Sequence, residues 1–269
     1  MFRLKISAVS DVGNFRDNNE DNFYLDNGVY NRESDDHAAY AYETDTAEKR
    51  IFAVCDGMGG GAMGEQMSLT AVQMLDELHP MLMNKNTAAV LNKHADEANR
   101  AICEALKAAG ADMGGTTSVI LSLEDGRAGV YNLGDSRAYL MRRDAERGKI
   151  MLYPLTEDHT LAQRKIKMGI YTEDDPWAQR EKHMLTKFLG VDKTYLGLNY
   201  QKNEPFSLHA GDVFLLCSDG VTDGCSARQI LSVLHQYRGD AAAAVVQAAL
   251  EAGSRDNTTA VVIEVLEDN

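Results

Sequence analysis

Residues 51–64 read IFAVCDGMGGGAMG, an apolar run that ends at an aspartate, Asp56, and continues into a cluster of glycines. The apolar run predicts a buried strand, and the spacing of apolar residues after Gly64 is typical of a helix. Gly59, Gly61 and Gly64 also fit G-x-G-x-x-G, a pattern that binds the pyrophosphate of a dinucleotide when a strand precedes it and a helix follows. Asp56 suggests a different chemistry, in which a carboxylate binds a metal ion.

The order of the predicted elements decides the fold class. Short runs rich in Val, Ile, Leu and Tyr and bounded by Gly, Asp or Asn predict strands at 4–10, 51–55, 118–123, 129–133, 138–141, 213–217 and 259–265. Helical spacing of apolar residues predicts helices at 64–83, 87–109, 226–237 and 240–252. Two consecutive helices between strands do not fit the alternating order of a parallel sheet. The order predicts an α+β fold with mostly antiparallel sheets and helices packed outside them.

The composition limits the class of protein. The chain has 269 residues, is 44% hydrophobic and 25% charged, and is therefore typical of a soluble globular protein. Its formal charge of −14 argues against general binding to nucleic acid or anionic membranes. The apolar segments are too short to span a membrane, and the first residues lack the long apolar region of a signal peptide.

The cysteines and the absence of repeats add two expectations. The four cysteines form no C-x-x-C pair, which indicates reduced thiols and a cytoplasmic location. We find no internal repeat and no low-complexity linker, so we expect one domain over residues 1–269. The polar, acidic segment 31–49 is expected to be a long hairpin loop or insertion with a solvated face.

Four aspartates lie at the ends of predicted core strands, and they are Asp56, Asp135 in NLGDSR, Asp219 in CSDG and Asp256 in SRDNTT. One aspartate beside a glycine is usually a turn residue. Four are harder to explain in that way, because the strands of one core place their ends close together. Clustered carboxylates cannot all stay ionised without a cation, and oxygen ligands without His or Cys favour Mg²⁺ or Mn²⁺.

Further polar residues follow the first predicted strand, in the stretch SDVGNFRDNNEDN at positions 10–22. Arg16 offers a planar fork that fits phosphate oxygens. Glu20 and Asp21 follow it by four and five positions, so a local ion pair is the alternative interpretation of Arg16.

Eight ordered blocks of sequence resemble one family: SDVGNFRDNNEDN, FAVCDGMGGGAMGE, MGGTTSVI, YNLGDSRAYL, LTEDHT, LTKFLG, LLCSDGVTD and DNTTAVVIEV. The chain resembles the metal-dependent serine/threonine protein phosphatases of type 2C (PPM), in particular the compact bacterial members. The resemblance covers almost the whole chain, in the order of the family. It implies a four-layer α-β-β-α sandwich, in agreement with the order of elements above.

The resemblance also implies a centre of two Mn²⁺ or Mg²⁺ ions at one end of the sandwich. By their motifs, Asp56 would bridge the two ions and the Gly57 carbonyl would bind one of them. Asp219 and Asp256 would complete the shell of the other ion. Asp135 would support a possible third ion together with Asp219.

The remaining implied roles concern water, substrate and partners. Glu20 and Asp21 would hold metal-bound water, and Arg16 would bind the substrate phosphate. A metal-activated water would then hydrolyse phosphoserine or phosphothreonine. The resemblance further implies phosphorylated protein substrates and a bacterial Ser/Thr kinase that the phosphatase opposes in signalling. We also expect a monomer that, from its charge and its short apolar segments, neither binds nucleic acid nor inserts into membranes.

Three features depart from the family pattern or add to it. Met58 stands where many eukaryotic members have a histidine proposed as general acid, so the proton donor remains open. His159 is interpreted as a structural, hydrogen-bonding histidine. Residues 161–195 correspond to the mobile flap of the family. Trp177 is expected to pin this flap to the domain, and the basic run 164–167 either attracts acidic phosphopeptides or forms a solvated helix face.

Two alternatives from other functional classes remain. A dinucleotide-binding oxidoreductase would explain the glycines of 59–64, but it lacks the required helix-then-strand order and leaves the four aspartates unexplained. A catalytically silent phosphatase-like module, kept for regulation or binding, would share the fold. Such proteins typically lose metal ligands, whereas every matched position is present here.

Overall fold

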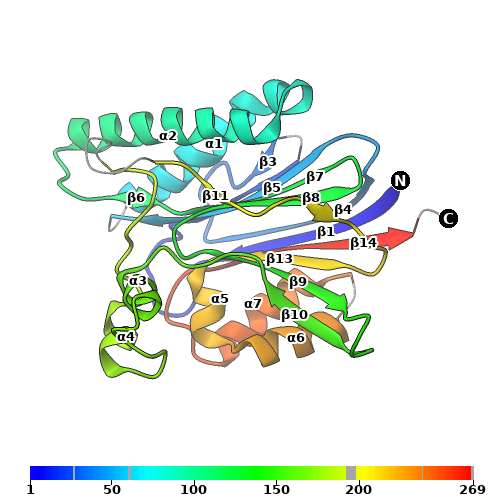
Figure 1. Cartoon of the computed structure of the whole chain (residues 1–269). Coiled ribbons are helices and arrows are strands. Elements are labelled where there is room, and N and C mark those ends of the chain that lie inside the picture. Colours follow the sequence, from blue (N-terminus) through cyan, green and yellow to red (C-terminus); the bar gives the residue numbers. More distant parts are fainter. Residues whose placement is uncertain (27, 60–61, 192–197, 238, 268–269) are drawn as a thin grey trace.

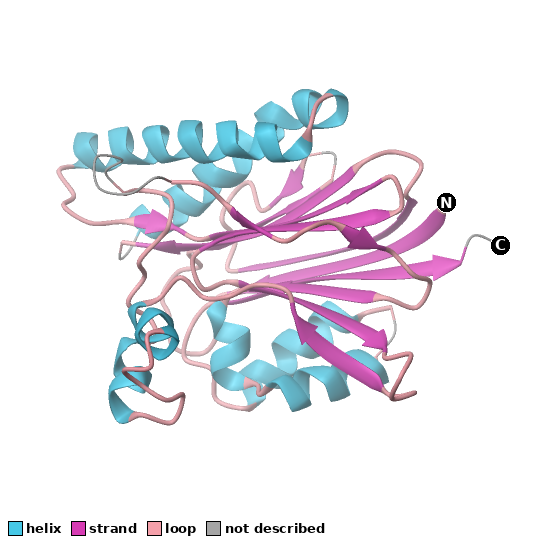
Figure 2. Ribbon diagram, in the orientation of Figure 1, coloured by secondary structure: helices cyan, strands magenta, loops and turns pink. Residues whose placement is uncertain are grey.

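The structure is a computed structural model that describes residues 1–26, 28–59, 62–191, 198–237 and 239–267. Two β-sheets pack face to face and helices cover both outer faces, which gives four layers, α-β-β-α (Figure 2). One helical layer contains α1 (Ala62–Asn84) and α2 (Thr87–Ala109), and the other contains α5 (Asp219–Gly224), α6 (Ala227–Gln236) and α7 (Ala241–Glu251). The predicted α+β sandwich is confirmed.

The described strand pairs are antiparallel in both sheets. The first sheet has the order β10 (Ile150–Pro154), β9 (Arg137–Arg143), β13 (Val213–Cys217), β14 (Thr258–Glu267), β1 (Phe2–Asp11) and β4 (His37–Asp45). The second has the order β11 (Gln201–Lys202), β8 (Arg127–Leu133), β7 (Ser118–Glu124), β5 (Arg50–Met58), β2 (Asp21–Leu25) and β3 (Val29–Tyr30), with β12 (Phe206–Ser207) beside β8 and β6 (Gly115–Thr116) beside β5.

Strand β5 shows why the opening sequence is apolar without interruption. Ile51, Ala53 and Cys55 pack in a core cluster with α1 and α2, whereas Phe52 and Val54 pack in the cluster between the two sheets. All five side chains are fully buried. A strand covered on both faces needs apolar residues on both, and burying one large side chain contributes about 1.5–3 kcal/mol.

The strand directions bring the predicted site residues to one end of the sandwich. The C-terminal end of β1 pairs with the first residues of β14, as in Ser10 opposite Thr259, and Cys217 at the end of β13 pairs with Ala260. In the other sheet, Asp21 at the start of β2 lies opposite Asp56 near the end of β5. Helices α3 (Leu161–Lys167) and α4 (Pro176–Glu181) lie outside the four layers, at the end of the sandwich away from both termini (Figure 1).

The expectation of a loop over 31–49 is wrong in its central part. Residues His37–Asp45 form β4, which pairs with β1 along its length and lies at the edge of the first sheet. The polar sequence is compatible with a strand because only one backbone edge is paired and most of the side chains reach solvent. The solvated face was therefore predicted correctly and the backbone conformation was not.

Two further observations complete the fold. Helix α1 begins at Ala62, so Gly64 lies in its first turn, whereas Gly60 and Gly61 of the glycine cluster lie outside the described residues. No helix among the described residues is both long enough and apolar enough to span a membrane.

Candidate metal centre

A cavity of about 410 Å³ lies at the end of the sandwich where the predicted residues meet. It is lined by Arg16, Glu20, Asp56, Gly57, Met58, Gly59, Thr117, Asp135, His183, Leu185, Asp219, Asp223 and Asp256. The structure therefore gathers every predicted site residue around one cavity except Asp21. Asp21 lies in β2, directly across the strand pair from Asp56, and is 1% exposed.

Asp56 is held by the strand ends on either side of it. Its backbone N–H donates to Thr117 Oγ1 at 2.9 Å, and its carbonyl accepts from the Thr117 N–H at 2.8 Å and from Thr116 Oγ1 at 2.9 Å. Burial raises the pKa of the Asp56 carboxyl well above its usual range, and the nearby Asp21 and Asp219 raise it further. An ionised Asp56 therefore needs a positive charge in this cavity.

Asp21 helps to connect the two sheets at the same end of the sandwich. Ser218, which follows β13, donates its hydroxyl to Asp21 Oδ2 at 2.7 Å and accepts from the Thr259 N–H at 3.0 Å. These bonds join the two sheets directly behind the cavity. Burial raises the pKa of Asp21 to about 7, although the hydrogen bond from Ser218 opposes this shift.

Two glycines let Glu20 approach the cavity. A Cβ at Gly57 would overlap the carbonyl of Gly64 and would lie 2.6 Å from the Glu20 carbonyl oxygen. A Cβ at Gly64 would overlap the Glu20 carboxyl and would lie 2.6 Å from its Oε1. Glu20 Oε1 itself is buried and has no hydrogen-bond partner within the described parts of the chain. A buried carboxylate oxygen without a donor is suited to a cation.

The loop between β1 and β2 is fastened to the start of β14. Asn257 Oδ1 accepts from the Glu20 N–H at 2.9 Å, and its Nδ2 donates to the carbonyls of Val12 and Asn18. Arg16 Nη2 donates to Asp256 Oδ2 at 2.7 Å. The ion-pair partner of Arg16 is therefore Asp256, far away in sequence, rather than the neighbouring acids that the sequence offered as an alternative. The guanidinium remains half-exposed at the cavity.

A histidine that the sequence did not suggest completes the cavity. His183 Nδ1 lies 3.1 Å from Asp219 Oδ2, and this contact raises the pKa of His183. Burial, followed by the charge of Asp219, raises the pKa of Asp135 to about 7. His183 follows α4 in an irregular, mostly half-buried segment, where no periodic pattern could have singled it out.

The donors in this cavity fit hard divalent cations. Carboxylates from several elements converge there, burial and mutual repulsion raise the pKa of Asp56, Asp135 and Asp256, and one oxygen of Glu20 has no donor. Oxygen ligands of this kind suit Mg²⁺ and Mn²⁺. Gly57 lines the same cavity and tolerates no Cβ, so only glycine fits at this position.

The structure also tests three subsidiary interpretations. His159 is buried, accepts from the Gly134 N–H through Nδ1 at 3.1 Å and contacts Gln201 Oε1 through Nε2 at 2.7 Å, so it supports the turn before Asp135 as a structural histidine. The expectation that Trp177 pins the flap is wrong, because Trp177 is 57% exposed and its ring contacts Arg180 of its own helix. Met58 lines the cavity and offers no acidic proton.

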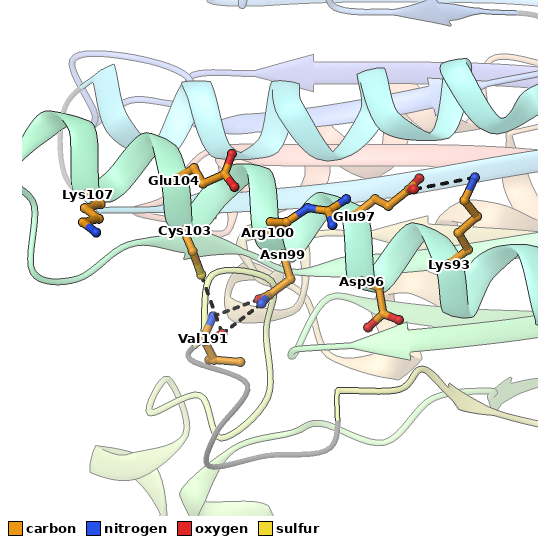
Figure 3. Close-up of a pocket in the computed structure, with 9 residues that line it drawn as sticks. All are labelled: Lys93, Asp96, Glu97, Asn99, Arg100, Cys103, Glu104, Lys107 and Val191. Carbon is orange, nitrogen blue, oxygen red and sulfur yellow. Dashed lines mark hydrogen bonds and ion pairs between the residues drawn. The ribbon is translucent and has the colours of Figure 1, made fainter.

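A second cavity, of about 670 Å³, runs along the outer side of α2 and is lined mainly by charged side chains of that helix. Figure 3 shows Asn99 reaching from α2 to Val191. Its Oδ1 accepts from the N–H groups of Gly190 and Val191, and its Nδ2 donates to the Val191 carbonyl. Asn99 therefore holds the backbone at Gly190 and Val191 against α2. The second cavity shares no lining residue with the first.

Comparisons with known proteins show the family and agree with the fold. A family model described as Protein phosphatase 2C matches residues 10–165, more than half of the chain. The chain is 30% identical over 269 residues to the serine/threonine protein phosphatase PstP of Mycobacterium tuberculosis (strain CDC 1551 / Oshkosh), with 98% of this chain and 45% of that protein covered. It thus spans about half the length of that relative.

Two further matches extend over nearly the whole of both chains. The chain is 28% identical to the serine/threonine phosphatase stp of Listeria innocua serovar 6a, with 95% of this chain and 93% of the relative covered. A crystal structure of the catalytic domain of PstP in complex with two manganese ions superposes with a TM-score of 0.76 and 29% identity, covering 99% of this chain and 100% of that chain.

Proposed function

The chain belongs to the protein phosphatase 2C family, and we propose that it hydrolyses phosphoserine and phosphothreonine in proteins with the aid of divalent metal ions. The observation that carries this proposal is the convergence of Glu20, Asp56, Asp135, Asp219 and Asp256 on one cavity beside Arg16. The family resemblance of the sequence is confirmed by the match. The relatives named above are serine/threonine phosphatases, which supports the same activity here.

The proposed cofactor is a pair of Mn²⁺ or Mg²⁺ ions, with a possible third. Asp56 would bridge the pair and the Gly57 carbonyl would bind one member, while Asp219 and Asp256 would bind the other. Two manganese ions in the related PstP structure support this number. When bound, such ions lower the pKa of a coordinated water and stabilise charge on the phosphoryl oxygens.

The side chains of this protein have separate tasks in the proposed reaction. Glu20 and Asp21 would accept hydrogen bonds from water and hold it near Asp56. The Arg16 guanidinium, half-exposed at the cavity, would bind two phosphate oxygens through its planar fork. Asp256, its present partner at 2.7 Å, keeps the guanidinium directed toward the cavity. These contacts would place the phosphorus next to the carboxylate cluster.

Several finer points belong to the same proposal. Residues 1–269 would form one catalytic domain, with a flap at about 161–195, of which 192–195 lie outside the described residues. Its substrates would be phosphorylated proteins, and a bacterial Ser/Thr kinase would be the enzyme that it opposes. The cytoplasmic location and the monomeric state stay predictions.

A catalytically silent module is the competing function. It would not need an intact ligand set, and here the predicted ligands Asp56, Gly57, Asp135, Asp219 and Asp256 all line one cavity, which supports an enzyme. The decisive measurement is release of phosphate from a phosphothreonine peptide by the purified chain, with Mn²⁺ and with a chelator. We expect turnover with Mn²⁺ that falls at least a hundredfold in Asp219→Asn, because the cation loses one of its ligands. A metal-loaded wild-type protein without turnover would require the silent-module interpretation.

A further inference from the structure

Asp135, His183 and Asp219 lie close together, and they offer two carboxylate oxygens and one imidazole nitrogen as ligands for a metal ion. Each offers one ligand atom, and these atoms lie within 4.8 Å of one another. They come from three separate elements: the turn between β8 and β9, the irregular segment after α4, and the first residue of α5. All three line the cavity that contains Asp56. The contribution of His183 distinguishes this group from the purely oxygen donors beside it.

The other ring nitrogen of His183 also faces a carboxylate. His183 Nε2 lies 3.5 Å from Asp223 Oδ2, and Lys182 donates to Asp223 Oδ1 at 2.8 Å. Histidines that bind a metal through one nitrogen commonly donate the other N–H to a carboxylate, which fixes the tautomer and the ring orientation. Asp223 would therefore keep the proton on Nε2 and leave Nδ1, the nitrogen nearest Asp219, to bind a cation.

The backbone around His183 is fixed to the segment that precedes α3. The Leu161 N–H donates to the Met184 carbonyl at 2.8 Å, and the Thr186 N–H donates to the His159 carbonyl at 2.7 Å. Met184 and Thr186 follow His183 by one and three residues, so these bonds hold the chain directly after it. The imidazole is thus placed by a short antiparallel contact as well as by its contacts with Asp219 and Asp223, which favours a defined ligand over a solvated surface histidine.

We propose that His183 is a nitrogen ligand of a third divalent ion, bound together with Asp135 and Asp219, and that this mixed donor set selects first-row transition ions over Mg²⁺. The inference deepens the proposed function, on which it rests for the neighbouring ions. Imidazole is a good ligand for transition ions, whereas Mg²⁺ prefers oxygen donors and retains its water. An ion bound here connects the segment after α4 directly to the strand ends that hold the substrate site.

Mn²⁺ is the probe for the test, because it is paramagnetic. The full chain is loaded with Mn²⁺ and examined by electron spin-echo envelope modulation, which detects ¹⁴N bound to the ion. We expect nitrogen modulation in the wild type and its loss in His183→Gln. The matched control is His37→Gln, since His37 is an exposed histidine whose Nδ1 lies 2.8 Å from Asp11 Oδ2 and which does not line the cavity. The control should retain the modulation.

A Mn²⁺ and Mg²⁺ titration gives a second readout. His183→Gln should weaken the weakest Mn²⁺ site about tenfold or more, and should change Mg²⁺ binding by less than about twofold. Asp135→Asn removes an oxygen ligand of the same ion and should also abolish the modulation, which keeps the test decisive if His183→Gln does not fold.

The outcomes separate this inference from the proposed function. Wild-type protein without nitrogen modulation, or unchanged modulation in His183→Gln, would overturn the role of His183. If the wild-type protein still hydrolyses phosphopeptide with Mn²⁺ in that case, the phosphatase proposal stands without the proposed role of His183. Nitrogen modulation that depends on His183, in a protein without phosphatase activity, would uphold the third site and reject the phosphatase.

Discussion

Replacing Asp135 with Asn should stabilise the metal-free protein, and the gain should grow as the pH rises. Asp135 is 7% exposed, and burial with the charge of Asp219 raises its pKa from 3.8 to about 7. Between these two values the folded protein holds a proton that the unfolded chain has lost. The stability that depends on this proton is fully present below about pH 4 and is lost as the pH rises through 7.

The size of the effect follows from the same shift. Relative to the protein with Asp135 fully protonated, a shift of about three pKa units lowers the free energy of unfolding by about 4 kcal/mol at pH 8 and by about 2 kcal/mol at pH 5. Asn occupies nearly the same volume and carries no charge to be buried. The advantage of Asp135→Asn over the wild type should therefore increase by about 2 kcal/mol between pH 5 and pH 8.

Urea unfolding in the presence of a chelator at these two pH values measures the difference. Asp174→Asn, at an exposed position, is the control and should show no comparable change with pH. Excess Mn²⁺ should reverse the order, because the ion stabilises the wild type through a ligand that Asp135→Asn lacks. An advantage that is equal at pH 5 and pH 8, or a loss of stability at pH 8 with chelator, would refute a buried, repelled carboxylate at Asp135.

Three other predictions follow from the same cavity and core. Arg16→Ala should raise KM for a phosphopeptide about tenfold with Mn²⁺ affinity nearly unchanged, as steady-state kinetics and calorimetry would show; an effect on Mn²⁺ affinity alone would contradict the phosphate role. Gly64→Ala should weaken Mn²⁺ binding about tenfold, because its Cβ displaces the Glu20 carboxylate; unchanged calorimetric affinity would refute this contact. Burial lowers the pKa of His94 to about 4, so the folded protein does not bind a proton that the unfolded chain binds below about pH 6.5. Between pH 7 and pH 5 the wild type should therefore lose about 2 kcal/mol of unfolding free energy that His94→Gln does not lose, as urea titration would measure. An identical pH dependence of the two proteins would exclude a buried, neutral His94.

The regular elements with complete hydrophobic patterns could be predicted from the sequence. The strand at 213–217 and the helix at 87–109 have the predicted bounds, since the first is an unbroken apolar run and the second lies between Asn86, which caps it, and Gly110, which ends it with a left-handed φ of 68°. Local chemistry determines both ends of that helix. Tertiary packing determines only which face of this helix is buried.

Elements that depend on a distant partner were missed. Strand β4 has few buried side chains and exists because β1 offers a free backbone edge, which a local pattern does not reveal. Helix α3 was foreseen only as one of the two interpretations of the basic run 164–167, because seven residues with one buried side chain, Ala162, give no detectable apolar periodicity. Trp177 was misjudged for a related reason: a large aromatic side chain is usually buried, yet here it is 57% exposed and its ring lies against Arg180 of the same short helix.

The same distinction explains which site residues could be predicted. Asp56 and Asp219 follow apolar strands whose burial is visible in the sequence, and antiparallel packing brings the ends of such strands together. Residues that reach the same cavity from loops give no such signal, whether they orient a neighbour, as Asn257 does, or are proposed ligands, as His183 is. Asn257 acts through three bonds to a loop about 240 residues away, and His183 reaches Asp219 from an irregular segment. Proposed ligands at strand ends are thus accessible to sequence analysis, whereas a proposed loop ligand such as His183 and the residues that orient the ligands depend on loop conformation. Those orienting residues should vary more freely between relatives of equal activity, because a different loop can supply the same hydrogen bonds.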